Sequence, residues 1–282
     1  MGKIAFGLAS IEASAVVPTA IGLPFARLLI LSVVGAALLG VGAGGVTTNR
    51  RPKMAAKKTV AIIGASRGLG LALADEYCAR GWHVIATSRG KSLGLDELHQ
   101  LYPASLEIET VDIVELASIQ ALKERLAGRR LDTLFVNAGI CKANELTPIA
   151  VNDQDFLDMM LTNALSPMRV IGALENLVPE NGVIAAMSSE IGSIGNSVGF
   201  WELYSSSKAA LNMLMKAFSA RRPDDPRALL LVAPGWVRTD MGGDEATLVI
   251  SDSIPLVVDM VERNAGVPGL RFTNRHGEIL PW

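Results

Sequence analysis

The stretch Thr59-Val60-Ala61-Ile62-Ile63-Gly64-Ala65-Ser66-Arg67-Gly68-Leu69-Gly70 decides the fold of this chain. It opens with a short apolar run rich in β-branched residues, which predicts a buried strand. It closes with a turn that contains three glycines, and the residues that follow, up to Arg80, have a helical pattern. A strand, a glycine-rich turn and a helix in this order are typical of a dinucleotide-binding site.

Each glycine of the turn has its own task in such a site. Gly64 permits the tight turn, Gly68 lets backbone N–H groups approach a pyrophosphate, and Gly70 allows close packing of the helix. The phosphate would lie at the N-terminus of the helix, where unpaired N–H groups favour an anion. Two other interpretations stay open. One is an ordinary strand-to-helix turn; the other is the Gly-x-Ser-x-Gly elbow of hydrolases with Ser66 as nucleophile, which needs an acid and a histidine downstream.

Composition excludes several classes of protein. The chain has 282 residues, 50% of them hydrophobic, and a formal net charge of −2, so it can bury one large core and shows no sign of a nucleic-acid partner. Its two cysteines match no zinc spacing, and its three histidines are scattered, so we expect neither a metal site nor a disulfide framework. These residues are Cys78, Cys141, His83, His99 and His276.

The N-terminal part contains an uncharged apolar segment, residues 28–46, followed by a cluster of basic residues. Its length just reaches that of a spanning helix, and insertion would place the rest of the chain in the cytoplasm. A signal peptide with a cleavage site at Val41-Gly42-Ala43 is a second interpretation, and a dispensable extension before Met54 is a third. We divide the chain into an extension, residues 1–57, and a catalytic domain, residues 58–282, that is cytoplasmic with or without a membrane tether.

From Thr59 onward, short β-branched runs alternate with amphipathic stretches, which predicts one α/β domain with a doubly wound parallel sheet of the Rossmann type. We expect strands at residues 59–63, 83–87, 106–110, 133–137, 183–187 and 228–232. Helices connect them. One helix should include Asn163 and be disturbed at Ser166-Pro167, and another should run from about Tyr204 to about Ser219.

Tyr204 and Lys208 form the most reactive pair of the sequence. If the segment is helical, the four-residue spacing places the phenol and the ammonium on one face. A neighbouring cation stabilises a phenolate, so we expect Lys208 to lower the pKa of Tyr204 and make it a usable proton donor. Taken alone, the pair also fits an ordinary surface contact.

The end of the second strand indicates which dinucleotide is bound. Enzymes that use NAD usually place an acid there to hold the ribose 2′-hydroxyl, but Thr87-Ser88-Arg89-Gly90-Lys91 contains none. Arg89, together with Arg67 of the glycine turn, suits the 2′-phosphate of NADP(H), because guanidinium groups bind phosphate in a bidentate manner. The alternative is that both arginines are solvated loop charges.

The order of these motifs resembles the short-chain dehydrogenase/reductase family across residues 59–282. The motifs are the glycine turn, Val111-Asp112-Ile113, Asn137-Ala138-Gly139, Asn163, Ser188-Ser189, Tyr204 with Lys208, and Pro234-Gly235-Trp236-Val237-Arg238-Thr239-Asp240. Residues 188–195, 234–243 and 276–282 are similar to the C-factor and sniffer-like carbonyl reductases. Ile63 departs from the family, which often has Thr there.

The resemblance implies catalytic roles. Tyr204 would be the general acid, Lys208 would tune it and bind the nicotinamide ribose, and Ser189 would hydrogen-bond the substrate oxygen, with Ser188 as the alternative. Asn163 would hold a water of the proton relay.

The resemblance also implies how the cofactor is held. Asp112 would meet the adenine, Asn137 to Gly139 would line the adenosine ribose and support the central strand, and Thr239 would meet the carboxamide; Asn137 could instead act mainly on backbone geometry. The full set is Gly64, Ser66, Arg67, Gly68, Leu69, Gly70, Arg89, Asp112, Ile113, Asn137, Ala138, Gly139, Tyr204, Lys208, Pro234, Gly235, Val237 and Thr239.

We therefore expect an NADP(H)-dependent oxidoreductase that acts on a carbonyl or secondary alcohol. Its partners would be a small-molecule carbonyl substrate and further copies of itself, as a dimer or tetramer, with membrane contact only through residues 28–46. An apolar pocket is indicated by Ile191, Ile194, Val198, Phe200, Trp201 and Met241. The alternative is a dinucleotide-binding sensor or signalling protein of C-factor type with little turnover.

Overall fold

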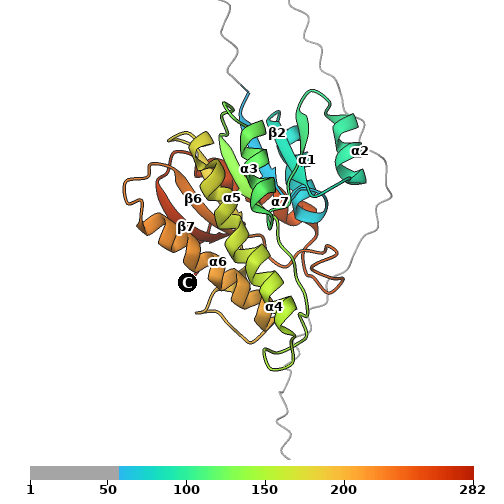
Figure 1. Ribbon diagram of the computed structural model, residues 1–282, viewed down its shortest axis with the longest axis vertical. Coiled ribbons are helices and arrows are strands. Elements are labelled where there is room, and N and C mark those ends of the chain that lie inside the picture. The colour runs from blue at the N-terminus through green and yellow to red at the C-terminus, as the bar shows by residue number, and fades with distance from the viewer. Residues whose placement is uncertain (1–56) are drawn as a thin grey trace, which may run out of the picture. The chain divides into compact units, whose positions relative to one another are not determined.

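The computed structural model describes residues 57–282, which form a parallel sheet of seven strands with helices on both faces (Figure 1). The strands are β1 Thr59–Ile63, β2 His83–Ser88, β3 Leu106–Thr110, β4 Thr133–Val136, β5 Val183–Met187, β6 Ala228–Ala233 and β7 Gly269–Asn274. Their order in the sheet is β3-β2-β1-β4-β5-β6-β7, so the winding reverses between β1 and β4. In open α/β sheets, ligands bind outside the carboxyl ends of the strands at such a reversal.

Helices cover both faces of the sheet. The α-helices are α1 Gly68–Ala79, α2 Leu93–Leu101, α3 Leu116–Arg125, α4 Asp153–Met160, α5 Ser166–Leu174, α6 Glu202–Ala220 and α7 Ile250–Arg263. The short turns are η1 Leu161–Leu165, η2 Glu175–Leu177 and η3 Glu190–Gly192. Helices α1, α2 and α7 share one buried core with the sheet, and α3, α5 and α6 share the other.

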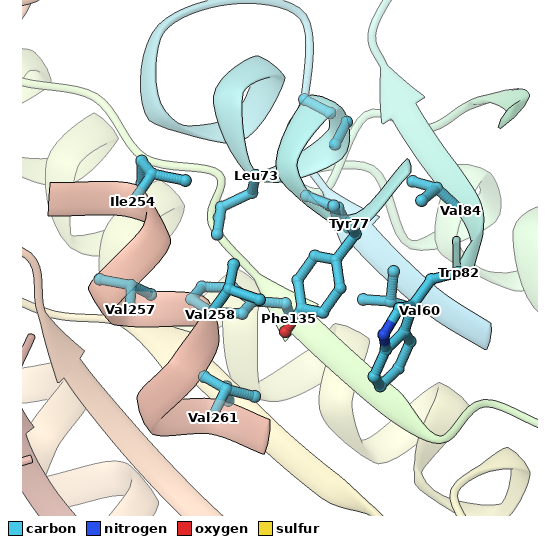
Figure 2. Packing of buried hydrophobic residues seen from close by; sticks show 14 of the residues in the cluster. Val60, Leu73, Tyr77, Trp82, Val84, Phe135, Ile254, Val257, Val258 and Val261 are labelled. Atoms are coloured by element: carbon cyan, nitrogen blue, oxygen red, sulfur yellow. The ribbon is translucent and has the colours of Figure 1, made fainter. Parts of the chain in front are cut away.

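The core beneath α1 and α7 is closed by aromatic packing. Figure 2 shows Tyr77 of α1 between the valines of α7 and Trp82, and the rings of Tyr77 and Trp82 meet edge to face with centroids 4.9 Å apart. Because Tyr77 is fully buried, this contact fixes α1, whose N-terminus begins at the glycine turn.

The predicted fold class is confirmed, and all six predicted strands occur within one residue of their expected ends. The seventh strand, β7, was not predicted. It lies at the edge of the sheet, pairs only with β6 among the described strands, and carries Arg271 in place of a continuous apolar run. Phe272 of β7 points inward and is buried. A weak alternation of apolar and polar residues was therefore the only sign of this strand in the sequence.

The disturbed helix is confirmed as well. Helices α4 and α5 join through the π turn η1, in which the N–H of Ser166 donates to the carbonyl of Leu161. Pro167 has no N–H, so it cannot bond to the carbonyl of Asn163 four residues earlier, and the helix widens there. Asn163 lies within this turn and is buried.

None of the helices within residues 57–282 is long and apolar enough to cross a membrane. The apolar segment 28–46 lies outside the described residues. The division of the chain at residue 57 and the nature of the extension stay predictions.

Candidate active site

A cleft of about 570 Å³ lies at the carboxyl ends of β1 to β6. One end is lined by the glycine turn and the ends of β2 and β3, and the other by residues that follow β5, α6 and β6. Its predicted lining residues are Gly64, Ser66, Arg67, Gly68, Leu69, Arg89, Asp112, Ile113, Asn137, Ala138, Gly139, Ser189, Tyr204, Lys208, Pro234, Gly235, Val237 and Thr239. The structure thus brings these residues to one cavity, whereas Gly70 and Asn163 lie buried behind its wall.

The glycine turn is held by hydrogen bonds to residues at the ends of β2 and β4. Gly64 has φ +89°, and a Cβ there would lie 2.7 Å from Ala138. Its N–H donates to Thr87 Oγ1 at 3.0 Å, and its carbonyl accepts from Asn137 Nδ2 at 2.7 Å. A Cβ on Gly70 would overlap the same carbonyl. The amide of Asn137 therefore supports the backbone of the turn, which is the alternative role stated above.

The N-terminus of α1 opens into the cleft at this turn. Gly68 and Leu69, its first residues, line the cavity, and its first turn holds no acidic side chain. Arg67 precedes the helix with an extended backbone and caps it with no side-chain hydrogen bond. Backbone N–H groups and the positive end of the helix dipole are thus available to an anion.

The two candidate phosphate-binding arginines differ in their surroundings. Arg89 is exposed at the end of β2 and makes no side-chain hydrogen bond or ion pair within residues 57–282. Arg67 donates from Nη1 to Asp240 Oδ2 at 2.6 Å, across the mouth of the cleft. Arg67 is thus paired with a carboxylate in this structure, whereas its role toward a 2′-phosphate stays a prediction. Both partners of this ion pair are largely exposed, so it contributes little to stability and can exchange.

Helix α6 carries Tyr204 and Lys208 on one face. Lys208 is almost fully buried, donates from Nζ to the carbonyl of Met187 at 2.9 Å, and lies 5.5 Å from the centre of the Tyr204 ring. Burial lowers the pKa of the Lys208 ammonium to about 8. Burial also raises the pKa of the Tyr204 phenol.

The pKa of Tyr204 therefore moves in the direction opposite to the one expected from the sequence. Desolvation disfavours the phenolate and the ammonium alike, and the Met187 carbonyl already accepts from the ammonium. The phenol stays a donor because it keeps its proton.

The two serines after β5 have different partners. Ser188 is buried and donates from Oγ to Asn212 Oδ1 at 2.7 Å. Ser189 is half-buried, and its hydroxyl has no protein partner among the described residues. The geometry thus favours Ser189 over Ser188 as the hydroxyl that is free to meet a ligand.

Both the oxygen and the nitrogen of the Asn163 side-chain amide form hydrogen bonds within the protein. Its Oδ1 accepts from the N–H of Ile140 at 2.8 Å, and its Nδ2 donates to the carbonyl of Ile140 at 2.8 Å and to Ser207 Oγ at 3.0 Å. The side chain fastens the loop after β4 to α6. A water would have to be held by its backbone carbonyl, which Pro167 leaves without the usual partner.

An aromatic wall closes the end of the cleft beside Tyr204. We define it as Phe200, Trp201 and Trp236. The rings of Phe200 and Trp201 stack with centroids 5.0 Å apart, and Trp201 meets Tyr204 at 6.0 Å and Trp236 at 6.3 Å, both edge to face. Trp201 has φ +47°, which bulky residues rarely adopt, and its stacking contacts offset this strain.

Some lining residues were not predicted from the sequence. Trp236 belongs to the motif that begins at Pro234 and lines the cleft, and its Nε1 donates to the carbonyl of Gly242 at 2.8 Å. The other lining residues without a predicted role are Ser88, Val111, Val114, Ile140, Thr162, Met187, Glu190, Asp240 and Gly242. Most of them follow directly on a predicted site residue, and that adjacency was the available signal.

The hydrolase interpretation finds no support in this geometry. No histidine is among the residues that line the cleft, and all three histidines belong to the described part of the chain. A serine nucleophile at Ser66 would need such a base within hydrogen-bond reach.

Comparisons with known proteins agree with the geometry. A model of the short chain dehydrogenase family matches residues 58–247. A short-chain dehydrogenase/reductase of Burkholderia multivorans, solved with bound NADP, is 47% identical, with 80% of this chain and 100% of that chain covered and a TM-score of 0.79. The carbonyl reductase Sniffer of D. melanogaster is 28% identical with the same coverage and a TM-score of 0.72.

Among curated proteins, the C-signal of Myxococcus xanthus is 34% identical over 158 residues, which covers 54% of this chain and 93% of that protein. The sequence resemblance is thereby confirmed. This chain belongs to the short-chain dehydrogenase family, with similarity to the sniffer-like carbonyl reductases.

Proposed function

We propose that this chain is an NADP(H)-dependent reductase that converts the carbonyl group of an apolar small molecule into an alcohol. The observation that carries the proposal is the placement of the Tyr204 and Ser189 side chains in one cleft with the glycine turn and Arg89. The cleft thus offers hydroxyl donors for a carbonyl oxygen and a site for a phosphorylated dinucleotide.

The residues of the turn fit a dinucleotide. The open N-terminus of α1 suits the pyrophosphate, and Arg89 has no competing partner within residues 57–282, which suits the 2′-phosphate of NADP(H). The end of β2 offers no acid to the 2′-position, because residues 87–91 contain none. The bound NADP in the Burkholderia relative at 47% identity supports the same cofactor here.

The side chains of Ser189, Tyr204 and Lys208 have different roles in the proposed reduction. NADPH, when bound, supplies the hydride. Ser189 donates a hydrogen bond to the carbonyl oxygen as negative charge develops on it, and Tyr204, which keeps its proton because burial raises its pKa, transfers that proton to the oxygen. Lys208 holds its charge 5.5 Å from the centre of the Tyr204 ring, and its ammonium would bind the ribose of the cofactor. The backbone carbonyl of Asn163, which has no N–H partner at Pro167, would be the group that holds a water of the proton relay.

The substrate end of the cleft suits an apolar molecule. The aromatic wall, with Ile191, Val198 and Met241 beside it, gives a hydrophobic surface next to Tyr204. The cationic residues that line the described cleft are Arg67, Arg89 and Lys208, of which the first two lie at the dinucleotide end and the third is buried. A substrate carboxylate or phosphate would therefore have no cation to bind.

Steady-state kinetics of the purified protein with a panel of neutral carbonyl compounds tests the proposal. We expect turnover with NADPH, and we expect Arg89→Ala to weaken NADPH binding by about 1.5–3 kcal/mol while NADH binding stays nearly unchanged. Arg263→Ala, which removes an exposed arginine outside the cleft, is the matched control. Equal losses for both cofactors would contradict the assignment of Arg89, and binding of NADPH with no turnover of any carbonyl would favour the sensor.

A further inference from the structure

Asn212 lies on the same face of α6 as Tyr204 and Lys208, at successive four-residue steps. Its side chain is buried, and both ends of the amide are used: Oδ1 accepts from Ser188 Oγ at 2.7 Å, and Nδ2 donates to the carbonyl of Gly192 at 3.1 Å. Since a carbonyl can only accept, Nδ2 must face Gly192, and the amide has one orientation.

These two hydrogen bonds bracket Ser189. Ser188 precedes it directly, and Gly192 ends the turn η3 that follows it. Within this segment the N–H of Gly192 donates to the carbonyl of Ser189 at 2.9 Å. Gly192 also rests on α6, because a Cβ there would lie 2.8 Å from Lys208 Cβ. The segment 188–192 is therefore fastened to the helix that carries Tyr204.

Lys208 holds the residue before this segment, since its Nζ donates to the carbonyl of Met187. Two consecutive turns of α6 thus hold the end of β5. Hydroxyl donors that converge on one oxygen must be placed to within about 0.5 Å to act together. A loop that ended at Ser189 without such an anchor would not meet this requirement.

We propose that Asn212 is a positioning residue that sets the Ser189 hydroxyl against the Tyr204 phenol. The inference rests on the proposed function, because it assigns Asn212 a role in the same reaction. Asn212 is not among the residues that line the cleft, so its side chain is not placed to contact a ligand there. It acts through Ser188 and Gly192.

Asn212→Asp separates positioning from packing, because it keeps the shape of the side chain. An ionised Asp accepts from Ser188 but repels the carbonyl of Gly192, whereas a protonated Asp can donate to that carbonyl as Asn does. Burial raises the pKa of such a carboxyl above its usual range near about 4. The protonated form, and with it the wild-type geometry, therefore returns as the pH falls through that raised pKa.

The experiment measures kcat, KM for a carbonyl substrate and Kd for NADPH in the full chain from about pH 5 to about pH 8. We expect Asn212→Asp to lower kcat by about 10- to 100-fold at neutral pH, with Kd for NADPH within about twofold of the parent. The ratio of variant to parent kcat should then rise as the pH falls. Asn264→Asp is the matched control, because Asn264 also donates from Nδ2 to a backbone carbonyl, that of Met260, but outside the cleft.

Ser188→Ala, which removes only one of the two bonds, is the second variant and should lower kcat by a smaller factor. Amide hydrogen exchange of residues 188–193 reports the anchoring without any turnover, and it should quicken in Asn212→Asp. A parent that binds NADPH but reduces no carbonyl defeats the proposed function, and the anchoring is then judged by exchange alone. Parent-like kcat in both variants, a loss that does not reverse at low pH, or unchanged exchange overturns the role of Asn212.

Discussion

Tyr204 is the side chain to which the proposed reaction assigns proton transfer. Tyr204→Phe keeps the ring that packs against Trp201 and lies beneath Lys208, and it removes only the hydroxyl. We expect turnover to fall by at least about 100-fold, as is typical when a general acid is lost, while NADPH still binds. Tyr102→Phe, outside the cleft, is the control and should retain full activity. Near-normal turnover in Tyr204→Phe would remove the phenol from the mechanism.

Lys208 gives the reaction a dependence on pH. Its pKa is lowered to about 8, so the ammonium is charged below that pH and loses its proton as the pH rises through it. The pKa of Tyr204 is raised, so the phenol stays protonated over the same range and cannot be the cause of a decline. We expect the rate of reduction at saturating NADPH to fall above about pH 8.

Lys208→Arg supplies the comparison, because a guanidinium has a pKa above about 12 and keeps its charge. The decline of the rate should then move to higher pH. A parent profile that stays flat between about pH 7 and about pH 10 would show that the charge of Lys208 does not govern the rate.

Sequence reasoning identified the residues of the site better than their contacts. The four-residue spacing of Tyr204 and Lys208 predicted their chemistry, and the resemblance to the family indicated Ser189, so the sequence alone pointed to all three. The ion pair of Arg67 with Asp240 joins residues that are far apart in the chain, so no local sequence pattern predicts it. The burial of the Asn163 amide has the same origin, because it depends on a loop and a helix that meet only in three dimensions.

At the scale of elements, the junction of β1 and α1 has no room for a side chain. A Cβ on Gly70 would overlap the carbonyl of Gly64 and lie 2.6 Å from Asn137 Nδ2. We therefore expect Gly70→Ala to lower the free energy of unfolding by about 1–3 kcal/mol, or more, and to weaken dinucleotide binding. Urea denaturation and NADPH titration measure the two effects.

Gly172 provides a matched substitution for which we expect the opposite change in the free energy of unfolding. It is exposed in the last turn of α5, and a Cβ there would have no heavy atom within 4 Å. Gly172→Ala should raise the free energy of unfolding by up to about 1 kcal/mol, because alanine favours a helix over glycine by that amount. If both substitutions lowered the free energy of unfolding, the close approach at Gly70 would not be the cause of its loss of stability.

The strands differed in how well the sequence predicted them. The interior strand β5 is buried along its whole length, so it appears as a continuous apolar run with sharp ends. The edge strand β7 begins at Gly269 with φ +94° and exposes one of its two faces in part, so its pattern is close to that of a loop. Its place in the sheet follows from pairing with β6, a long-range contact that the sequence does not encode locally.

At the scale of the whole molecule, residues 57–282 contain both buried cores and the entire cleft. We propose that the first 53 residues contribute nothing to catalysis, and a chain that starts at Met54 should be folded, soluble and as active as the full chain. Circular dichroism and kcat/KM measure this. A truncated chain that cannot fold would place the domain boundary earlier.

The same pair of chains tests the apolar segment 28–46. If that segment is an anchor, the full chain should stay with membranes through a carbonate wash, and the chain that starts at Met54 should not. If the wash releases both chains, the segment is not an anchor, and the signal peptide and the dispensable extension remain as its interpretations.

The aromatic wall belongs to two loops, whereas Tyr204 and Lys208 stand on α6 and Ser189 stands at the end of a central strand. Loops tolerate substitution better than packed elements, so the apolar end of the cleft can be altered without moving the groups to which the proposed reaction assigns proton transfer. For laboratory evolution, Phe200 and Trp236 are the positions to randomise. Trp201 should be varied only to glycine or asparagine, because its left-handed backbone excludes most other side chains.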